Sequence, residues 1–331
     1  MNEKQSTKQR LLIIRDLLKK YTDEQNELTI RELVDLYYEN TEQTVGHKAI
    51  RDDLKELAES GLFDVIENHE KNGVEKYYSH QTRLFEIHEL RLLIDAVSSA
   101  KFITQTETEN LVNKLKKLTS YHLAKQLENR ILLPAGTKTE NKSVRNAINS
   151  LHEAIWKQQT IQFQYGKYTL QKDFQLNRNG DYYLVKPYAL VWNNEFYYLI
   201  GEFVPEGDIR HYRIDRMRNV EVTENTFILD PTFNINHYTQ TLFHMYSGEE
   251  RSIEIEFVDQ LLNVVIDRFG LNVNIRPHTE GTFRITTNAV ISDGLVRWLL
   301  TWGSDAKVLT PPSLVDRMKT EAEKLYKQYQ Q

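Results

Sequence analysis

The feature that most constrains the fold is a change of hydrophobic period near residue 160. In most of the chain before this point, apolar residues recur every three or four positions, the spacing of helices that bury one face. From Thr160 the period becomes two, because Ile161, Phe163 and Tyr165 alternate with glutamines. A chain that changes period in this way is expected to build separate helical and sheet-containing parts. The sequence therefore predicts an α+β protein with several domains.

Length and composition agree with this prediction. The 331 residues exceed what one hydrophobic core ordinarily serves, which predicts two or three domains. Cysteine is absent, so disulfides and thiolate metal sites are excluded. The amino-terminal stretch is polar, and no segment approaches the roughly 18 apolar residues of a membrane helix. These features predict a cytoplasmic protein with no membrane partner.

Three stretches with helical spacing occupy residues 8 to about 60. The second is expected to open at Thr29, which suits an N-cap, and the third is expected to open at Thr44. The third should end near Ser60-Gly61, since glycine commonly follows a helix. The next stretch, DVIENHEKNGVEKYYS, reads as two strands around Asn72-Gly73, a strong hairpin signal. Helices followed by a hairpin predict a winged helix-turn-helix over residues 1–80.

The third helix has the two faces that a recognition helix needs. Its apolar positions at Ile50, Leu54 and Leu57 cluster on one side, and cations cluster on the other. Cations and short polar side chains on a free face can enter the major groove and bind phosphates. The alternative is a helical hairpin with ordinary surface lysines, which the excess of acids over bases in residues 1–60 favours. The predicted DNA-binding residues are Thr44, Gly46, His47, Lys48, Arg51 and Lys55.

The rest of the chain divides into segments that differ in the spacing of their apolar residues. Helical spacing over residues 84 to about 130 predicts a connector or dimerisation element, so residues 81–143 are assigned as a helical linker. After a further helix from Val144, short strands and recurrent turns predict a small, bent sheet or barrel. Strands and helices then alternate to the end of the sequence. Residues 144–225 and 226–331 are predicted to be two further domains.

The barrel segment is rich in aromatic residues and ends in clustered arginines. Aromatic side chains fill 13 of the 50 positions from Phe163 to Tyr212, and RHYRIDRMR over residues 210–218 places four arginines in nine residues. If these nine residues form one strand, Arg213 and Asp215 share a face, while Arg210 and Arg218 lie near the ends in solvent. Arg213 and Arg216 are then the best candidates to bind an anion. A structural role for the arginines is the alternative.

Several of these segments together resemble a known family. VKPYALVWNNEFYYLIGEF and RHYRIDRMRNVEV resemble the core of a WYL domain, whose tryptophan-tyrosine-leucine signature corresponds to residues 197–199 with tyrosine in the first position. Arg213-Ile214-Asp215-Arg216-Met217 matches the family's Arg-hydrophobic-Asp-Arg-hydrophobic feature, and Pro187 matches the proline before the first strand. HKAIRDDLKEL resembles the recognition helix of winged helix-turn-helix regulators, FEIHELRLLIDAV their linking helices, and VRWLLTWGSDAKVLTPP their C-terminal extension.

The resemblance implies a homodimeric bacterial transcriptional regulator that binds double-stranded DNA. Its WYL domain, an Sm/SH3-like small β-barrel, would sense a nucleotide or nucleic acid, and an α/β C-terminal extension domain would follow. By motif position the residues that bind this effector would be Tyr165, Tyr188, Tyr198, His211, Arg213 and Arg216.

Two other classes of function would need different sequence features. The sequence has no Gly-rich phosphate loop, no His-Glu-x-x-His and no Gly-x-Ser-x-Gly, so we expect no catalysis. Its ten histidines show no metal-ligand spacing, so neither a metal nor a cofactor is expected. The remaining alternative is a single-stranded nucleic-acid-binding protein that acts mainly through the Arg/Tyr surface of the barrel.

Overall fold

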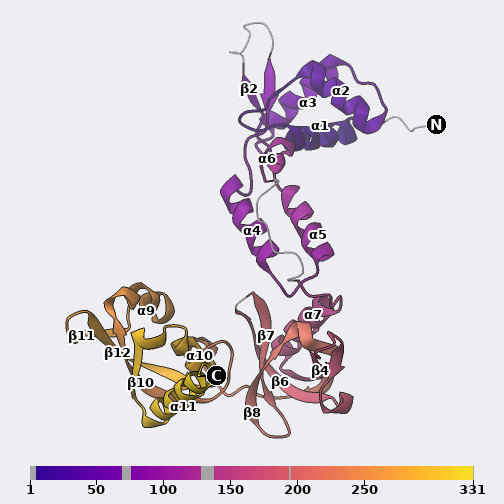
Figure 1. Ribbon diagram of the computed structural model, residues 1–331. Coiled ribbons are helices and arrows are strands. Elements are labelled where there is room, and N and C mark those ends of the chain that lie inside the picture. The colour runs from indigo at the N-terminus through magenta and orange to yellow at the C-terminus, as the bar shows by residue number, and fades with distance from the viewer. Residues whose placement is uncertain (1–4, 69–75, 128–137, 194, 331) are drawn as a thin grey trace. The chain divides into compact units, whose positions relative to one another are not determined.

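The computed structural model describes residues 5–68, 76–127, 138–193 and 195–330. Contacts divide the chain into two compact units, Met1–Glu140 and Asn141–Gln331 (Figure 1). This division is coarser than the four ranges expected from the sequence, whose boundaries stay predictions. None of the helices in the described residues is long and apolar enough to cross a membrane.

Three helices form the start of the first unit. They are α1 (Thr7–Tyr21), α2 (Ile30–Thr41) and α3 (His47–Glu59). The side chains of Ser6 and Thr29 cap α1 and α2, so the predicted N-cap at Thr29 is confirmed. The apolar stripes of the three helices meet in one core, together with a strand residue. Its buried members are Ile14, Leu17, Leu18, Leu33, Tyr37, Ile50, Leu54, Leu57 and Tyr78.

The third helix begins three residues later than the sequence predicted. Its first residue is His47 and its N-cap is Gly46, whereas Thr44 lies in the preceding loop. Val45 and Ile50 both pack in the core of the three helices, at the positions just before the N-cap and in the fourth helical residue. This apolar contact is a hydrophobic staple and fixes where the chain enters the helix. The predicted end near Ser60-Gly61 is confirmed, because Ser60 is the C-cap.

A small sheet accompanies the three helices. Its strands β1 (Leu28–Thr29), β2 (Ile66–Asn68) and β3 (Tyr77–Ser79) are antiparallel, in the order β1-β3-β2. The pairing of β2 with β3 is the hairpin that the sequence predicted. Its turn at Asn72-Gly73 lies outside the described residues. Strand β1 was not predicted, since two residues leave no period to detect.

The linker segment is helical, as expected. Helices α4 (Ile87–Ser99) and α5 (Gln105–Lys116) pack side by side, and the short α6 (Tyr121–Gln126) follows (Figure 1). The hydroxyl of Ser120, which caps α6, donates a 2.5 Å hydrogen bond to the buried carboxylate of Asp23, just beyond α1. This bond attaches the linker to the three-helix part within the same unit.

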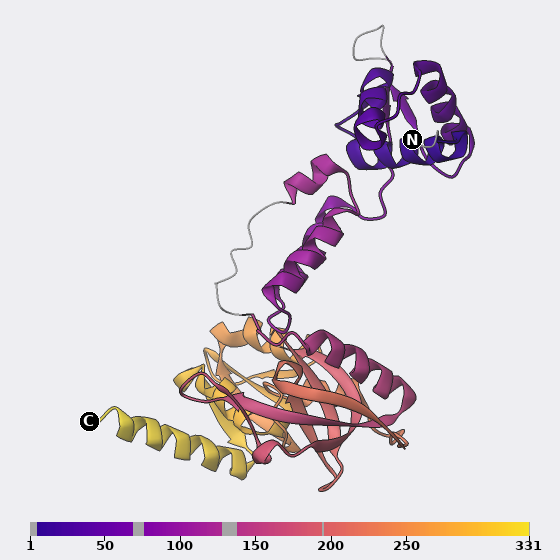
Figure 2. The same cartoon turned by 90° about the vertical axis from the view of Figure 1, so that its right-hand side faces the viewer.

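The second unit opens with α7 (Val144–Lys157) and a curled sheet. The strands pair in the order β5-β4-β6-β7-β8. Strand β9 lies outside this order and also pairs with β4. Among the described residues β8 and β9 are not paired, so the sheet is a half-barrel, against which α7 packs (Figure 2). The strands are β4 (Gln159–Tyr168), β5 (Phe174–Leu176), β6 (Tyr183–Asn193), β7 (Phe196–Phe203), β8 (Asp208–Arg213) and β9 (Met217–Thr226).

The expectation of one strand across residues 210–218 is wrong. Strand β8 ends at Arg213, a 3₁₀ turn covers Ile214–Arg216, and β9 starts at Met217. Ile214 and Met217 are both buried, although a continuous strand would point them to opposite faces. Burial of these two residues thus favours a turn, and the predicted facing of the arginines does not hold.

The remainder of the second unit is a four-stranded sheet with helices. The sheet order is β11-β12-β10-β13, and its core includes Phe257, Ile285 and Leu295. The predicted strand–helix order is confirmed, while α8 and β11 were not predicted. The elements are α8 (Ile235–Thr241), β10 (Glu249–Val258), α9 (Leu262–Phe269), β11 (Asn274–Pro277), β12 (Thr282–Ile291), α10 (Asp293–Leu300), β13 (Ala306–Thr310) and α11 (Pro312–Gln328).

Candidate functional site

The outer face of α3 carries a row of cations. Lys48, Arg51 and Lys55 follow each other at helical spacing and are exposed, opposite the buried Ile50 and Leu54. Neither Lys48 nor Arg51 forms a hydrogen bond or ion pair with another side chain of the described residues. Thr44, Gly46 and His47 are exposed as well, at the start of the helix. All six residues predicted to bind DNA therefore lie on one accessible surface.

One acid of α3 is removed from this surface by an ion pair. The Asp53 carboxylate accepts bonds from Nε and Nη2 of Arg10, at 2.6 and 3.1 Å. Its side chain is 4% exposed, against 21% for Arg10. The pair therefore joins α1 to α3 on the buried side of the helix, and its charges are not available to a ligand.

A further cation, Lys76, lies close to α3, directly before strand β3. The charge of Arg51 opposes protonation of Lys76, although the hydrogen bond to Glu67 is stronger in effect and raises the pKa of Lys76 overall. Lys76 is exposed and directly follows the residues that the structure leaves undescribed. Lys76 thus lies near Arg51 with its own charge paired to Glu67, a proximity that the spacing of the helix alone could not reveal.

The second candidate surface surrounds the turn between β8 and β9. Arg213 binds Asp215 through Nε and Nη2, at 3.1 and 2.8 Å, and its guanidinium lies 3.4 Å from the ring centre of Phe196. This ion pair fits the structural role that the sequence left open as the alternative for Arg213. Because both a carboxylate and a ring hold Arg213, this guanidinium has little freedom to take up another anion.

Arg216 differs from the other arginines of the segment. It forms no hydrogen bond or ion pair with the described residues and is half-buried. Burial raises the pKa of Tyr165 and of Tyr198, and the charges of Arg213 and Arg216 oppose both increases. The hydroxyl of Tyr165 also accepts a 3.1 Å bond from the backbone N–H of Arg213. The turn therefore brings together four of the six residues expected to bind an effector.

The other two arginines of the segment are held by the protein itself. Arg210 pairs with Asp208 at 2.8 Å and also with Glu206, over the ring of Phe203. Arg218 donates to two backbone carbonyls at 3.0 and 2.7 Å and stacks 3.9 Å from the ring centre of Phe174. Burial lowers the pKa of Arg218. The expectation that Arg218 lies in solvent is wrong, since the turn directs it onto the sheet.

The remaining two residues expected to bind an effector bond elsewhere. The hydroxyl of Tyr188 donates to Glu202 at 2.6 Å. His211 lies 2.7 Å through Nδ1 from the carbonyl of Met245 and 3.0 Å through Nε2 from the hydroxyl of Tyr238. Burial lowers the pKa of His211, which favours a neutral ring that donates to Met245 and accepts from Tyr238. Both side chains have thus used their polar atoms inside the protein.

Sequence reasoning missed one neighbour of this surface. The Tyr246 hydroxyl acts on the ionisation of Tyr198 and accepts a 3.1 Å bond from Nη1 of Arg297. These residues are 48 or more positions from Tyr198, and no local pattern connects them. Only the packing of the second unit brings them to the half-barrel.

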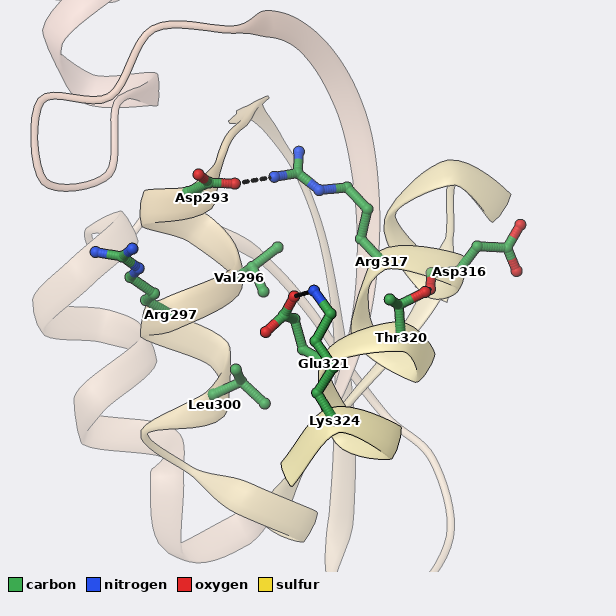
Figure 3. Close-up of a pocket in the computed structure, with 9 residues that line it drawn as sticks. All are labelled: Asp293, Val296, Arg297, Leu300, Asp316, Arg317, Thr320, Glu321 and Lys324. Atoms are coloured by element: carbon green, nitrogen blue, oxygen red, sulfur yellow. Dashed lines mark hydrogen bonds and ion pairs between the residues drawn. The ribbon is translucent and has the colours of Figure 1, made fainter. Parts of the chain in front are cut away.

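A separate cleft of about 460 Å³ lies between α10 and α11 (Figure 3). Val296 and Leu300 form its apolar wall, and Arg317 pairs with Asp293 across one end. Lys324 pairs with Glu321 at 2.6 Å. Most charges of this cleft are matched within it, so it offers an anion less than Arg216 does. In the described ranges, no group of three or more acidic or histidine side chains could hold a metal ion.

Comparisons with known proteins identify the second unit. A family model described as the WYL domain matches residues 146–222, and one described as the WCX domain matches residues 249–326. A search of curated proteins found no match.

Among solved structures, the chain is similar to Proteasome accessory factor B/C (PafBC) of Arthrobacter aurescens, at 18% identity and a TM-score of 0.29, over 93% of this chain and 45% of that one. It is also similar to a CRISPR Cas-related protein, at 13% identity and a TM-score of 0.36, over 98% of this chain and 84% of that one. The chain thus spans about half the length of PafBC, and such distant likenesses do not bear on its function. The chain contains a WYL domain followed by a WCX domain.

Proposed function

We propose that this chain is a cytoplasmic, homodimeric transcription regulator. It binds a specific duplex through a winged helix-turn-helix in residues 1–80, and its WYL domain binds an anionic effector, a nucleotide or nucleic acid. Binding, and not catalysis, is its activity. The observation that carries the proposal is that Lys48 and Arg51 are exposed, with no partner in the described residues, on a helix whose other face is buried. A helix of this kind can enter the major groove and bind base edges and phosphates.

The effector part of the proposal is supported by Arg216. A half-buried guanidinium with no carboxylate, beside Tyr165 and Tyr198, is suited to a phosphate that a base could accompany on the tyrosine rings. Occupancy would reach the DNA-binding part through the linker helices. A coupling of about 1–3 kcal/mol between the two sites is enough to change duplex affinity from several-fold to about a hundredfold.

The dimer part of the proposal is supported by α11. Its first turns pack on the core of the second unit through Leu314, Val315 and Met318, but every residue from 322 to 330 is exposed. Leu325 and Tyr326 on this half are 43% and 67% exposed. A helix end that leaves Leu325 and Tyr326 exposed is suited to pairing with a second copy of the chain. A two-fold operator would follow from such a dimer.

The test is selection from sheared genomic duplex DNA, followed by sequencing of the retained fragments. Arg51→Ala is compared with Arg145→Ala, which removes an equally exposed arginine from α7 of the other unit. Enrichment of a two-fold-symmetric site by the parent and by Arg145→Ala, and its loss in Arg51→Ala, is the expected result. Equal enrichment by all three proteins would contradict the assignment of α3 as the recognition helix.

A second candidate function is single-stranded nucleic-acid binding by the WYL surface. It is favoured by the exposed aromatic side chains of the half-barrel, since Tyr168 is 56% and Trp192 48% exposed. Fluorescence anisotropy with a labelled oligonucleotide separates the two functions. Single-strand affinity that exceeds duplex affinity, and that Arg216→Ala abolishes, would make this the main activity. Duplex preference that survives Arg216→Ala would favour the recognition helix.

A further inference from the structure

A pocket lined by lysines lies in the first unit, between the end of α1 and the segment that joins α5 to α6. Its volume is about 440 Å³, which is within the range of small-molecule sites. Lys19 and Lys20 reach it from the last turn of α1, and Lys116 and Lys117 from the end of α5. Its remaining lining residues are Asp16, Thr119, Tyr121 and Ala124.

The charges of this pocket are not balanced within it. Asp16, the one acid among the described lining residues, already accepts two bonds from Arg15, at 3.0 and 2.8 Å. Lys19 and Lys117 form no hydrogen bond or ion pair with the described residues, and Lys20 lies over the ring of Tyr21, 4.7 Å from its centre. Lys19 and Lys117 thus bring two charges with no partner in the described residues to one concavity, in a chain whose net charge is −5. In the α10–α11 cleft, by contrast, Arg317 and Lys324 are paired with acids of the same cleft.

We infer that this lysine pocket binds an anion that bears phosphate groups. Lysine binds phosphate as a point charge, and several lysines around one cavity match an anion of two or more charges. The exposed ring of Tyr121 and the methylene stems of the lysines form an apolar wall beside these charges. A free phosphate compound or the backbone of a nucleic acid duplex would offer the same chemistry.

Stabilisation of helix ends is the competing explanation. Lysines in the last turn of a helix interact favourably with its carbonyl end, and both α1 and α5 carry two of them there. That role requires no cavity and no third element. It also predicts that removal of the lysines changes stability and leaves ligand binding untouched. The two explanations therefore differ in what a binding measurement shows.

An anion bound in this pocket would connect two parts of the first unit. Lys19 and Lys20 belong to the three-helix part of the unit, and Lys116 and Lys117 to the linker helices. One anion held by Lys19 and Lys117 would add an attachment between these parts, beside the bond from Ser120 to Asp23. The site is distinct from the Arg216 surface and does not rest on the proposed function.

The test is isothermal titration calorimetry of the full chain with inorganic pyrophosphate. Lys19→Gln/Lys117→Gln is compared with Lys142→Gln/Lys327→Gln, which removes the same charge from exposed positions of the other unit. Lys19→Arg/Lys117→Arg keeps the charge and reports on folding. We expect Lys19→Gln/Lys117→Gln to weaken pyrophosphate binding roughly tenfold or more, while the arginine variant and the control bind as the parent does.

Duplex affinity of the same proteins identifies the source of the phosphate. Loss of pyrophosphate binding with unchanged duplex affinity supports a free phosphate compound. Loss of both, with pyrophosphate competing against duplex, supports the DNA backbone. The inference is overturned if Lys19→Gln/Lys117→Gln binds both ligands as the control variant does. It is equally overturned if Arg216→Ala alone removes all pyrophosphate binding, a result that would instead favour the proposed effector site.

Discussion

The outer face of α3 and the arginine segment 210–218 use cationic side chains in opposite ways. On α3, Lys48 and Arg51 are exposed and have no partner in the described residues. In the segment, the protein's own carboxylates bind Arg210 and Arg213, and backbone carbonyls bind Arg218. The denser cluster therefore offers a ligand fewer free charges than the sparser one.

Acidic neighbours explain this difference. Asp208 and Asp215 each lie two residues from an arginine they bind: Asp208 lies in β8 with Arg210, and the turn brings Asp215 to Arg213. On α3, Asp53 faces inward to Arg10 and Glu59 pairs only with Lys55, at 3.6 Å, so that Lys48 and Arg51 keep no partner in the described residues. The capacity of a segment to bind anions follows from how many cations its own acids leave free, and not from how many it contains.

The largest loss of stability is expected at the ion pair whose carboxylate is most buried. Arg10→Ala should lower the free energy of unfolding by about 3 kcal/mol, because it leaves the Asp53 carboxylate, 4% exposed, without a partner. Urea unfolding at neutral pH measures this loss. Arg15→Ala is the matched control on the same helix, since its partner Asp16 is 64% exposed and the pair should contribute less than about 1 kcal/mol. Equal losses in the two variants would show that burial does not decide the cost.

A free cation should show the reverse behaviour. Arg51→Ala should weaken duplex binding by about 2 kcal/mol, roughly thirtyfold, and leave the unfolding free energy unchanged. Fluorescence anisotropy with the selected duplex and urea unfolding of the same preparation test both halves. If Arg51→Ala lost enough stability to explain its loss of duplex binding, Arg51 would have a structural role, as Arg210 and Arg213 do. The contrast between α3 and the arginine segment would then be wrong.

Arg213 and Arg216 differ in the same way, since Arg213 is paired with a carboxylate and Arg216 has no partner in the described residues. Arg213→Ala should lower the free energy of unfolding by about 1.5 kcal/mol, because Asp215 is 10% exposed and loses its partner. Arg216→Ala should leave stability unchanged and reduce anion binding. Thermal unfolding and an oligonucleotide titration of both variants, with Arg276→Ala as an exposed control from the same unit, decide this point. Unchanged stability in Arg213→Ala would contradict the structural role.

Much of the fold could be predicted because most elements bury only one face. Apolar spacing located α1, α2, α7 and the last three helices, and strand alternation located β4 and β10. The start of α3 was missed because a staple between Val45 and Ile50, and not Thr44, decides where the helix begins. The turn after Arg213 was missed because alternation holds only while a strand continues.

The candidate sites were less predictable than the elements that carry them. The α3 surface could be predicted because all its residues lie within one helix and its first turn. The lysine pocket could not, since Lys20 and Lys116 are nearly a hundred residues apart and meet only through tertiary packing. The same reason hid Tyr246 from the surface around Arg216. Sequence reasoning thus identifies sites made by one element and misses those made by two.

The smallest effect concerns a histidine that could have been a free cation. Burial lowers the pKa of His211 below its usual value of about 6.5, while its two nitrogens bond to Met245 and to Tyr238, whose own pKa burial raises to about 12. The unfolded chain therefore takes up a proton first as the pH falls. Stability from His211 should be complete above about pH 6.5 and decline below it, by at most about 1.4 kcal/mol per pH unit.

Urea unfolding between pH 7.5 and 5.5 checks this expectation. The parent should lose stability on acidification, and His211→Gln should start less stable but lose less over the same range. His47→Gln is the control, because His47 is exposed on α3 and should leave the slope unchanged. His80 in the first unit, whose pKa burial also lowers, contributes with the same sign and remains in every variant. If the unfolding free energy of His211→Gln fell with pH as steeply as that of the parent, the expectation would be wrong. His211 would then take up its proton without losing its bonds, as an exposed side chain does.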